Sequence, residues 1–164
     1  MKKNLIRVTY FSCVLSLLLA CGAKKEEHTT GAAIDNEQIK KEIQVRENEF
    51  AEVYNSRELK NIGYYANDAM VFSQNRVPII GREAIVAYLK AGVDSSSVGN
   101  KISFLTREVF VYNEGNQVLE VGSFKLVDTA EAIINTGNYM VLFEKQDGMY
   151  KSVREMSTSD MPRM

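Results

Sequence analysis

Glu120 and Glu155 are the residues whose type best suits chemistry in this chain. Both lie in C-terminal segments where polar and apolar residues alternate. Two carboxylates that face one apolar cavity can share a proton or have raised pKa values, and acid–base catalysis needs such groups. The alternative is that each carboxylate is a hydrogen-bonded structural residue, with Glu155 paired to Arg154 or to another cation.

The folded part of the chain offers few other catalytic groups. The sequence contains one histidine, His28, and two cysteines, Cys13 and Cys21, all of which precede the segments expected to fold. Ser-His-Asp and Cys-His nucleophile systems and zinc sites rich in histidine or cysteine are therefore excluded from the domain. We expect no metal and no cofactor, so any acid–base chemistry must use Asp, Glu, Lys or Tyr.

The first 21 residues have the layout of a secretory signal. Three basic residues precede an apolar run over residues 8–20, which is too short to span a bilayer because a helix needs about 20 residues to do so. Leu17-Leu18-Leu19-Ala20-Cys21 resembles the lipobox of bacterial lipoproteins. The resemblance implies a signal peptide over residues 1–20, lipidation at Cys21 and attachment to the membrane through acyl chains.

Residues 21–33 are polar and rich in small residues, which indicates a flexible tether after the acylated cysteine. Residues 24–27, Lys-Lys-Glu-Glu, resemble the surface-export tags of some Bacteroidetes-type lipoproteins, although a charged tether would look the same. We expect a lipid-anchored protein of the bacterial cell envelope, at the outer membrane, and leave open the periplasmic face or the cell surface. Residues 34–164 suit one domain, and a net charge of −1 gives no basic footprint for nucleic acid.

Hydrophobic spacing predicts helices first and strands afterwards. The expected helices run from Asp35 to Tyr54, through a short segment that carries Leu59, Ile62 and Tyr65, and from about Arg82 to Ala91 with a stop at Gly92. A strand is expected over residues 69–73. Four further strands, joined in part by hairpin turns, are expected over residues 102–112, 117–127, 133–145 and 149–157.

Apolar residues occupy both alternating faces of the expected C-terminal strands. In the strand over residues 117–127, for example, Gly122 and Phe124 face one way, whereas Leu119 and Val121 face the other. A sheet that is apolar on both sides needs two covers. Helices can cover one face, and a second subunit is the simplest cover for the other, so we expect a homodimer.

Several short motifs, in order, resemble those of nuclear transport factor 2-like domains. Residues 64–72 together with 81–85 resemble the "YADDAVF … GREAI" segment, and residues 120–122 resemble the Glu-x-Gly strand. Residues 137–139 together with 145–151 resemble the "GxY … KxDGxWK" hairpin. Residues 153–162 resemble the "VRDMWNSDMP" sequence that ends SnoaL-like members. The resemblance implies an α+β fold. It implies a nuclear transport factor 2-like cone with three N-terminal helices packed on a curved antiparallel sheet, an internal cavity and, usually, a dimer.

Ketosteroid isomerases are the best-understood enzymes with this resemblance, and their catalytic groups are missing here. They use an Asp base, with a Tyr and a protonated Asp as oxyanion donors. In the alignment the base position is Ser73, the oxyanion Asp position is Met140 and the Tyr position is Phe50. Because methionine cannot donate a strong hydrogen bond and serine is not basic near neutral pH, we do not expect the isomerase reaction.

The same alignment indicates which residues line the cavity. They come from the first helix and from the inner faces of four strands: Phe50, Tyr54, Val71, Ser73, Glu120, Gly122, Phe124, Asn138, Met140, Leu142, Val153, Glu155 and Ser157. A one-residue slip in any strand would turn its set to the other face.

Three functions stay open, because this superfold hosts enzymes, binders and assembly domains. A mostly apolar lining with a few polar groups predicts a lipid-anchored module that binds a small apolar or amphipathic molecule. The second hypothesis is a proton-transfer isomerase, lyase or hydrolase that uses Glu120 or Glu155. The third is a protein-interaction domain that uses its outer sheet face.

Overall fold

Six strands form one sheet, in the order β2-β1-β6-β5-β4-β3. The computed structural model describes residues 35–161, so the expected signal peptide, the lipidation site at Cys21 and the tether lie outside the described residues. The strands are β1 (Tyr65–Ser73), β2 (Ile79–Ile80), β3 (Lys101–Tyr112), β4 (Gln117–Val127), β5 (Ile133–Gln146) and β6 (Met149–Ser159). Neighbouring strands are antiparallel, except that β1 and β6 are parallel.

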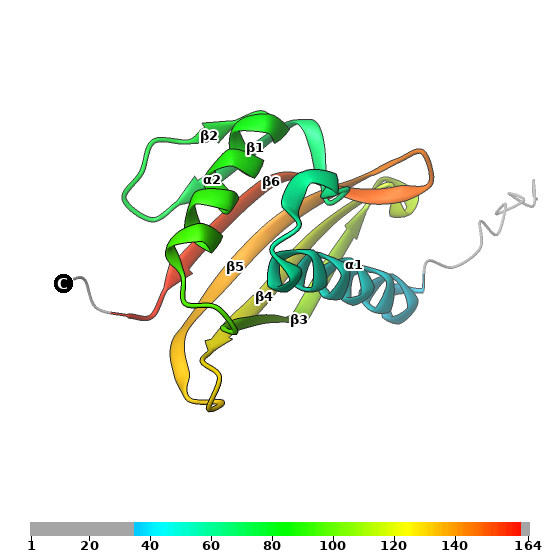
Figure 1. Cartoon of the computed structure of the whole chain (residues 1–164). Coiled ribbons are helices and arrows are strands. Elements are labelled where there is room, and N and C mark those ends of the chain that lie inside the picture. The colour runs from blue at the N-terminus through cyan, green and yellow to red at the C-terminus, as the bar shows by residue number, and fades with distance from the viewer. Residues whose placement is uncertain (1–34, 162–164) are drawn as a thin grey trace, which may run out of the picture. The chain divides into compact units, whose positions relative to one another are not determined.

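Two α-helices, α1 (Asn36–Ser56) and α2 (Arg82–Ser95), lie on the same face of the sheet (Figure 1). Asp35 starts α1, because its carboxylate accepts hydrogen bonds from the backbone nitrogens of Glu37 and Gln38 at 3.0 and 3.1 Å. The helix presents Ile43, Glu47 and Phe50 to the interior. The helices therefore leave a space between themselves and the inner face of the strands, where the lining side chains meet.

The expectation of three N-terminal helices is wrong. Residues 59–61 form only a 3-10 turn, and Tyr65 already belongs to β1. The apolar residues that suggested a short helix are instead buried around this turn and the start of the strand, with Leu59 and Ile62 in the core. In addition, α2 continues through Gly92 to Ser95, so this glycine does not end the helix as the sequence suggested.

Side chains of α1 cover the outer edge of β3, which is the last strand of the sheet. The amide of Asn55 donates to the Ile102 carbonyl at 2.9 Å and accepts from the Ile102 backbone nitrogen at 2.8 Å. Gln44 makes the equivalent pair, donating to the Phe104 carbonyl at 3.2 Å and accepting from the Thr106 nitrogen at 2.8 Å. These bonds satisfy edge groups that would otherwise be free to pair with another chain.

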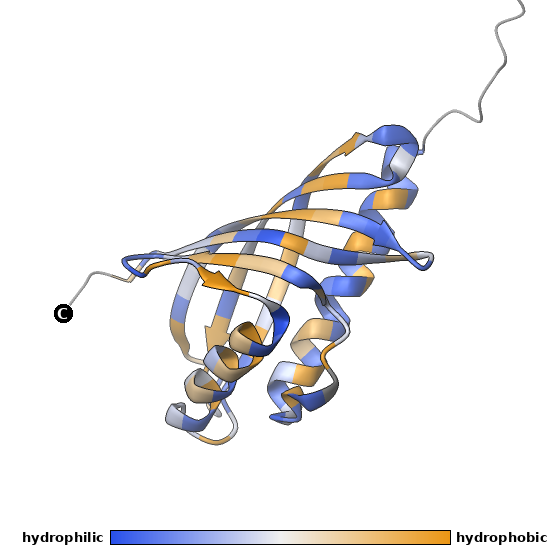
Figure 2. Cartoon of the chain, turned by 90° about the horizontal axis from the view of Figure 1, so that it is seen from above, coloured by the Kyte–Doolittle hydropathy of each residue, from blue (hydrophilic) through white to orange (hydrophobic). Residues whose placement is uncertain are grey.

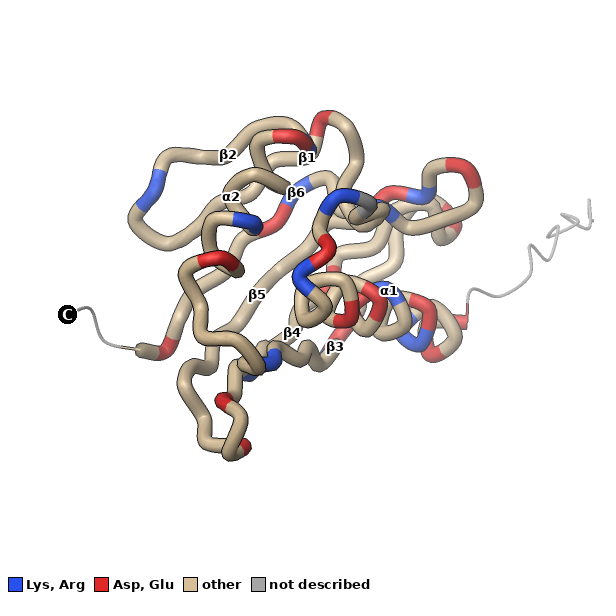
Figure 3. The backbone as a smooth tube through the Cα atoms, viewed as in Figure 1, with Lys and Arg blue, Asp and Glu red and all other residues tan. Residues whose placement is uncertain are grey.

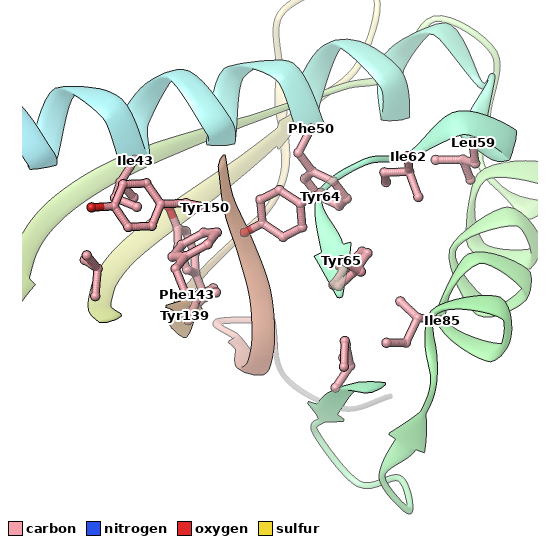
Figure 4. Packing of buried hydrophobic residues seen from close by; sticks show 14 of the residues in the cluster. Ile43, Phe50, Leu59, Ile62, Tyr64, Tyr65, Ile85, Tyr139, Phe143 and Tyr150 are labelled. Carbon is pink, nitrogen blue, oxygen red and sulfur yellow. The ribbon is translucent and has the colours of Figure 1, made fainter. Parts of the chain in front are cut away.

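Aromatic rings form the centre of the core between α1 and the sheet (Figure 4). Phe50 of α1 lies 4.6 Å from Tyr64, centroid to centroid, and Tyr64 in turn lies 4.9 Å from Tyr65 and 5.5 Å from Phe143. Tilted and edge-on pairs at these spacings add to the stability that apolar burial provides. The cluster fixes the rings that form one wall of the candidate site.

The opposite face of the sheet carries apolar side chains that no described element covers. Hydrophobic and hydrophilic residues alternate along the strands (Figure 2). The exposed outer side chains include Leu105, Phe110, Tyr112, Met140 and Met156. Cross-strand register places Phe72, Met156, Met140 and Val121 in one row across four strands.

Charged residues of both signs are interspersed along the helices and loops (Figure 3). Within residues 35–161, no helix has the length and apolar character that crossing a membrane requires.

Candidate functional site

A pocket of about 170 Å³ lies between the two helices and the inner face of the sheet. For scale, an engineered apolar cavity of about 150 Å³ binds benzene. Eight of the lining side chains are aromatic, and two are carboxylates. The lining residues are Glu47, Phe50, Tyr54, Tyr64, Tyr65, Val71, Ser73, Ile85, Tyr88, Leu89, Ile102, Phe104, Phe124, Tyr139, Val141, Glu155 and Ser157.

Seven residues expected to line the cavity do line this pocket. They come from α1, β1, β4 and β6: Phe50, Tyr54, Val71, Ser73, Phe124, Glu155 and Ser157. Ser73 and Phe50, which the alignment placed at the base and tyrosine positions of ketosteroid isomerases, are thus both at the pocket wall, where neither supplies the catalytic group of those enzymes.

The expectation for β5 is wrong by one residue. Tyr139 and Val141 face the pocket, whereas Asn138, Met140 and Leu142 face the outer side of the sheet. The register shows this directly, because Tyr139 pairs with Gly122 and Val141 with Glu120, both on the inner face of β4. Since side chains alternate along a strand, one residue of error turns the whole set over.

Gly122, Glu120 and Val153 are buried but do not line the pocket. A Cβ atom on Gly122 would lie 2.2 Å from Cζ of Tyr139, so the glycine makes room for that ring to lie across β4. Val153 lies at an irregularity in the pairing of β5 with β6, where Leu142 pairs with Arg154 and Phe143 already pairs with Ser152. A bulge of this kind turns a side chain away from the simple alternation.

Each of three glutamates accepts a hydrogen bond from a tyrosine hydroxyl. Tyr65 donates to Glu155 at 2.9 Å, Tyr139 donates to Glu120 at 3.0 Å, and Tyr64 donates to Glu47.

Glu120 is the deepest of the three carboxylates, with no exposed surface. Its Oε1 atom also accepts from the hydroxyl of Thr106 at 2.6 Å. Its Oε2 atom has no hydrogen-bond partner among the described residues. A buried carboxylate oxygen without a partner costs free energy, and a protonated Glu47 carboxyl group is the neighbouring side chain that can donate a hydrogen bond to Glu120.

Burial raises the pKa of all three carboxyl groups. For Glu155, desolvation raises the pKa to about 7, with the Tyr65 hydrogen bond lowering it and the Glu120 charge raising it. Desolvation and then the Glu120 charge hold the pKa of Glu47 well above its ordinary value. The pKa of Glu120 is also raised by desolvation, against hydrogen bonds from Thr106, Tyr139 and Glu47 that lower it.

No positive side chain balances these carboxylates within residues 35–161. The three salt bridges of this part of the chain, Arg46–Glu49, Lys90–Asp94 and Lys151–Asp147, do not involve them. Arg154 donates to the backbone carbonyls of Asp68 and Val153, so the pairing of Arg154 with Glu155 considered from the sequence is not present. In the same residues, no group of acidic, histidine or cysteine side chains has a metal-binding arrangement.

Sequence reasoning missed Glu47, although the sequence carries a signal for it. Glu47 lies between Ile43 and Phe50 at the spacing of one helical face, so a charged residue interrupts the apolar stripe of α1. A carboxylate on the buried face of a helix needs a hydrogen-bond or charge partner, or it belongs to a functional site. The lining role of Tyr64 and Tyr65 had no comparable signal, because buried tyrosines are ordinary core residues.

No protein-family model and no curated protein sequence matches the chain. Solved structures do match. A domain of unknown function with a cystatin-like fold from Nostoc punctiforme PCC 73102 has a TM-score of 0.64 at 12% identity, with 77% of this chain and 78% of that chain covered. An NTF-2 like protein of unknown function from Shewanella oneidensis MR-1 has a TM-score of 0.60 at 21% identity, with coverage of 71% and 96%.

A ketosteroid isomerase-like protein from Erwinia carotovora atroseptica SCRI1043 is similar as well, with a TM-score of 0.57, 14% identity and coverage of 78% of this chain and all of that chain. Identities this low establish the fold and leave the activity open. The fold implied by the motifs is therefore confirmed: this chain has the nuclear transport factor 2-like fold, also called the cystatin-like fold.

Proposed function

We propose that this domain is a binding module that holds one small organic molecule, with an apolar or aromatic body, in the pocket between its helices and sheet. The observation that carries the proposal is the pocket itself, which is built from eight aromatic side chains and a few polar groups. Binding sites for small molecules have this composition, with apolar walls for affinity and a few polar groups for orientation.

The size and rigidity of the pocket support this function. A volume of about 170 Å³ suits a ligand of roughly benzene size or a little larger. Neighbouring rings support one another in the wall, since Phe104 lies 5.3 Å from Phe50 and 5.6 Å from Tyr139, centroid to centroid. A wall that is packed before the ligand arrives reduces the entropy lost on binding.

A second candidate function is a proton-transfer enzyme that uses Glu155. The specific observation is a carboxyl group at the pocket wall with its pKa raised to about 7. A general acid or base works best with a pKa near the working pH. Glu120 is the weaker candidate of the two predicted from the sequence, because it does not reach the pocket lining.

Native mass spectrometry of the chain from residue 34 onward, purified from cells without denaturation, tests the binding function. We expect a fraction with one additional small mass, and loss of that mass in Ser157→Phe, whose ring would fill the pocket. Val77→Phe, on an exposed loop residue, is the matched control and should keep the adduct. If wild-type protein carries no adduct and binds no aromatic compound when one is added, the binding proposal is wrong.

The anchor at Cys21 remains a proposal that rests on the sequence. Under this proposal, the domain would be attached to the bacterial envelope through the acylated Cys21 and the residues that follow it. Cys21→Ser should move the protein from the membrane fraction to the soluble fraction, and an unchanged membrane fraction would contradict lipid anchoring.

A further inference from the structure

We infer that the ligand of the pocket is an organic cation, an amine or quaternary ammonium group attached to a small apolar or aromatic body. The inference rests on the proposed binding function and names its ligand class.

Two carboxyl groups at the pocket wall have no cationic partner among the described residues. Glu155 and Glu47 line the pocket, and Glu120 lies behind them with a fully buried and unpartnered oxygen. No salt bridge within residues 35–161 reaches any of the three. A buried carboxyl group without a cation nearby is either protonated or ionised at a cost in free energy. A cationic ligand would remove that cost by pairing with the carboxylate.

Aromatic side chains are the largest group among the residues that line the pocket with these carboxyl groups. Rings from six elements line the pocket together with Glu155, including Phe50 of α1, Tyr65 of β1, Tyr88 of α2 and Tyr139 of β5. Aromatic faces attract ammonium groups through the ring quadrupole, and cages of several rings bind quaternary ammonium ligands. One of these rings is already used in this way, since the Arg76 guanidinium lies 5.3 Å from the centroid of Tyr88.

Other ligand classes fit the pocket less well. An anion would meet the carboxyl groups of Glu47 and Glu155 in a pocket that no described lysine or arginine lines. A neutral molecule would fill the volume but would leave the carboxylates of Glu155 and Glu47 without a cationic partner when they are ionised. A cation satisfies the carboxylates and the rings together.

A calorimetric comparison of three probes of similar size tests this inference on the chain from residue 34 onward: phenethylamine, 2-phenylethanol and phenylacetate. At pH 8 we expect phenethylamine to bind at least about tenfold more tightly than 2-phenylethanol, which corresponds to one charge-assisted contact. Phenylacetate should bind least. Equal affinity for the amine and the alcohol would overturn the inference that the ligand is a cation, but not the proposed binding function. No binding by any probe would overturn both the inference and the proposed function.

Matched variants locate the charge that the cation contacts. Glu155→Gln and Glu47→Gln should each weaken phenethylamine binding about tenfold and change 2-phenylethanol binding little. Glu52→Gln removes the same charge from an exposed position of α1, so it should leave all three affinities unchanged. If Glu52→Gln weakened phenethylamine binding as much as Glu155→Gln, the amine would be attracted by the acidic protein in general. That result would overturn the assignment of the cation to this pocket.

Proton release on binding is a second measurement, and it distinguishes contact with the carboxyl groups from a fit to the shape of the pocket. The titratable groups near Glu155 are Tyr64, Tyr65 of β1, Glu120 of β4, Glu47 of α1 and Tyr139 of β5. A cation that enters should expel a proton from these carboxyl groups. We therefore expect the enthalpy of phenethylamine binding at pH 7 to depend on the ionisation enthalpy of the buffer, and that of 2-phenylethanol not to. A buffer-independent amine enthalpy in wild type would overturn the contact with the carboxylates.

Discussion

At the scale of single residues, the buried glutamates make the stability of the free protein depend on pH in an unusual direction. Desolvation raises the pKa of Glu155 to about 7 from an ordinary value of 4.5. The folded state therefore holds this proton more tightly than the unfolded state does. Stability contributed by the protonated group is complete below about pH 4.5 and is lost as the pH rises through 7, and the raised pKa of Glu47 and Glu120 acts in the same direction.

Glu155→Gln tests this linkage, because glutamine keeps the shape and removes the ionisation. We expect the free energy of unfolding at pH 8 to rise by up to about 3 kcal/mol and its decline between pH 5 and pH 8 to become shallower. Urea unfolding at both pH values, with Glu52→Gln as the exposed control, measures the change. A pH dependence identical to that of wild type would contradict the raised pKa.

Gly122 must be a glycine, because a side chain at this position would collide with the Tyr139 ring. Gly122→Ala should destabilise the domain by about 1–3 kcal/mol, as overpacking does, because the added Cβ would lie 2.2 Å from Cζ of Tyr139. The displaced ring should also lose its bond to Glu120. Gly63→Ala is the control, since no atom lies within 4 Å of its added Cβ. Thermal unfolding of both variants decides the matter, and equal melting temperatures would contradict the close approach.

At the scale of elements, the sequence was sufficient wherever one local signal decided the outcome. The cap at Asp35, the alternation in the last four strands and the hairpin turn at Asp147-Gly148 all predicted elements that the structure contains. Errors arose where tertiary packing decided instead. Residues 59–61 are too few for a helix once the chain must turn into β1, and the set of β5 that lines the pocket depends on its register with Gly122.

The edge of β3 gives a prediction at this scale. Asn55→Ala with Gln44→Ala should leave backbone groups of Ile102, Phe104 and Thr106 without partners. We expect a loss of about 1–3 kcal/mol for each site and faster amide hydrogen exchange at Ile102 and Thr106. Gln38→Ala, at an exposed position of the same helix, should change neither quantity. Unchanged exchange in the double variant would contradict the role of α1 as an edge cover.

At the scale of the whole molecule, we propose that the outer face of the sheet is the interface of the homodimer expected from the sequence. Met140 and Met156 are paired across β5 and β6 and are 44% and 53% exposed, in a row with Phe72 and Val121. A contiguous apolar face of this kind usually marks an interface. A second copy of the chain, facing the first through the same surface, would bury it with closed symmetry.

Light scattering after size exclusion tests the homodimer. Wild-type domain should have the mass of a dimer, and Met140→Lys should have that of a monomer because a buried interface excludes the unpaired charge. Val77→Lys changes an exposed loop residue and should remain dimeric. A monomeric wild type would contradict the homodimer and leave the face for a different partner.

A crystal structure of residues 34–164 grown with phenethylamine tests the central claim most directly. We predict one molecule in the pocket, with its ring among Phe50, Tyr88 and Tyr139 and its nitrogen within hydrogen-bond distance of the Glu155 carboxylate. A pocket that contains only ordered water, or one closed by the surrounding rings, would contradict the claim that this domain holds a small organic cation.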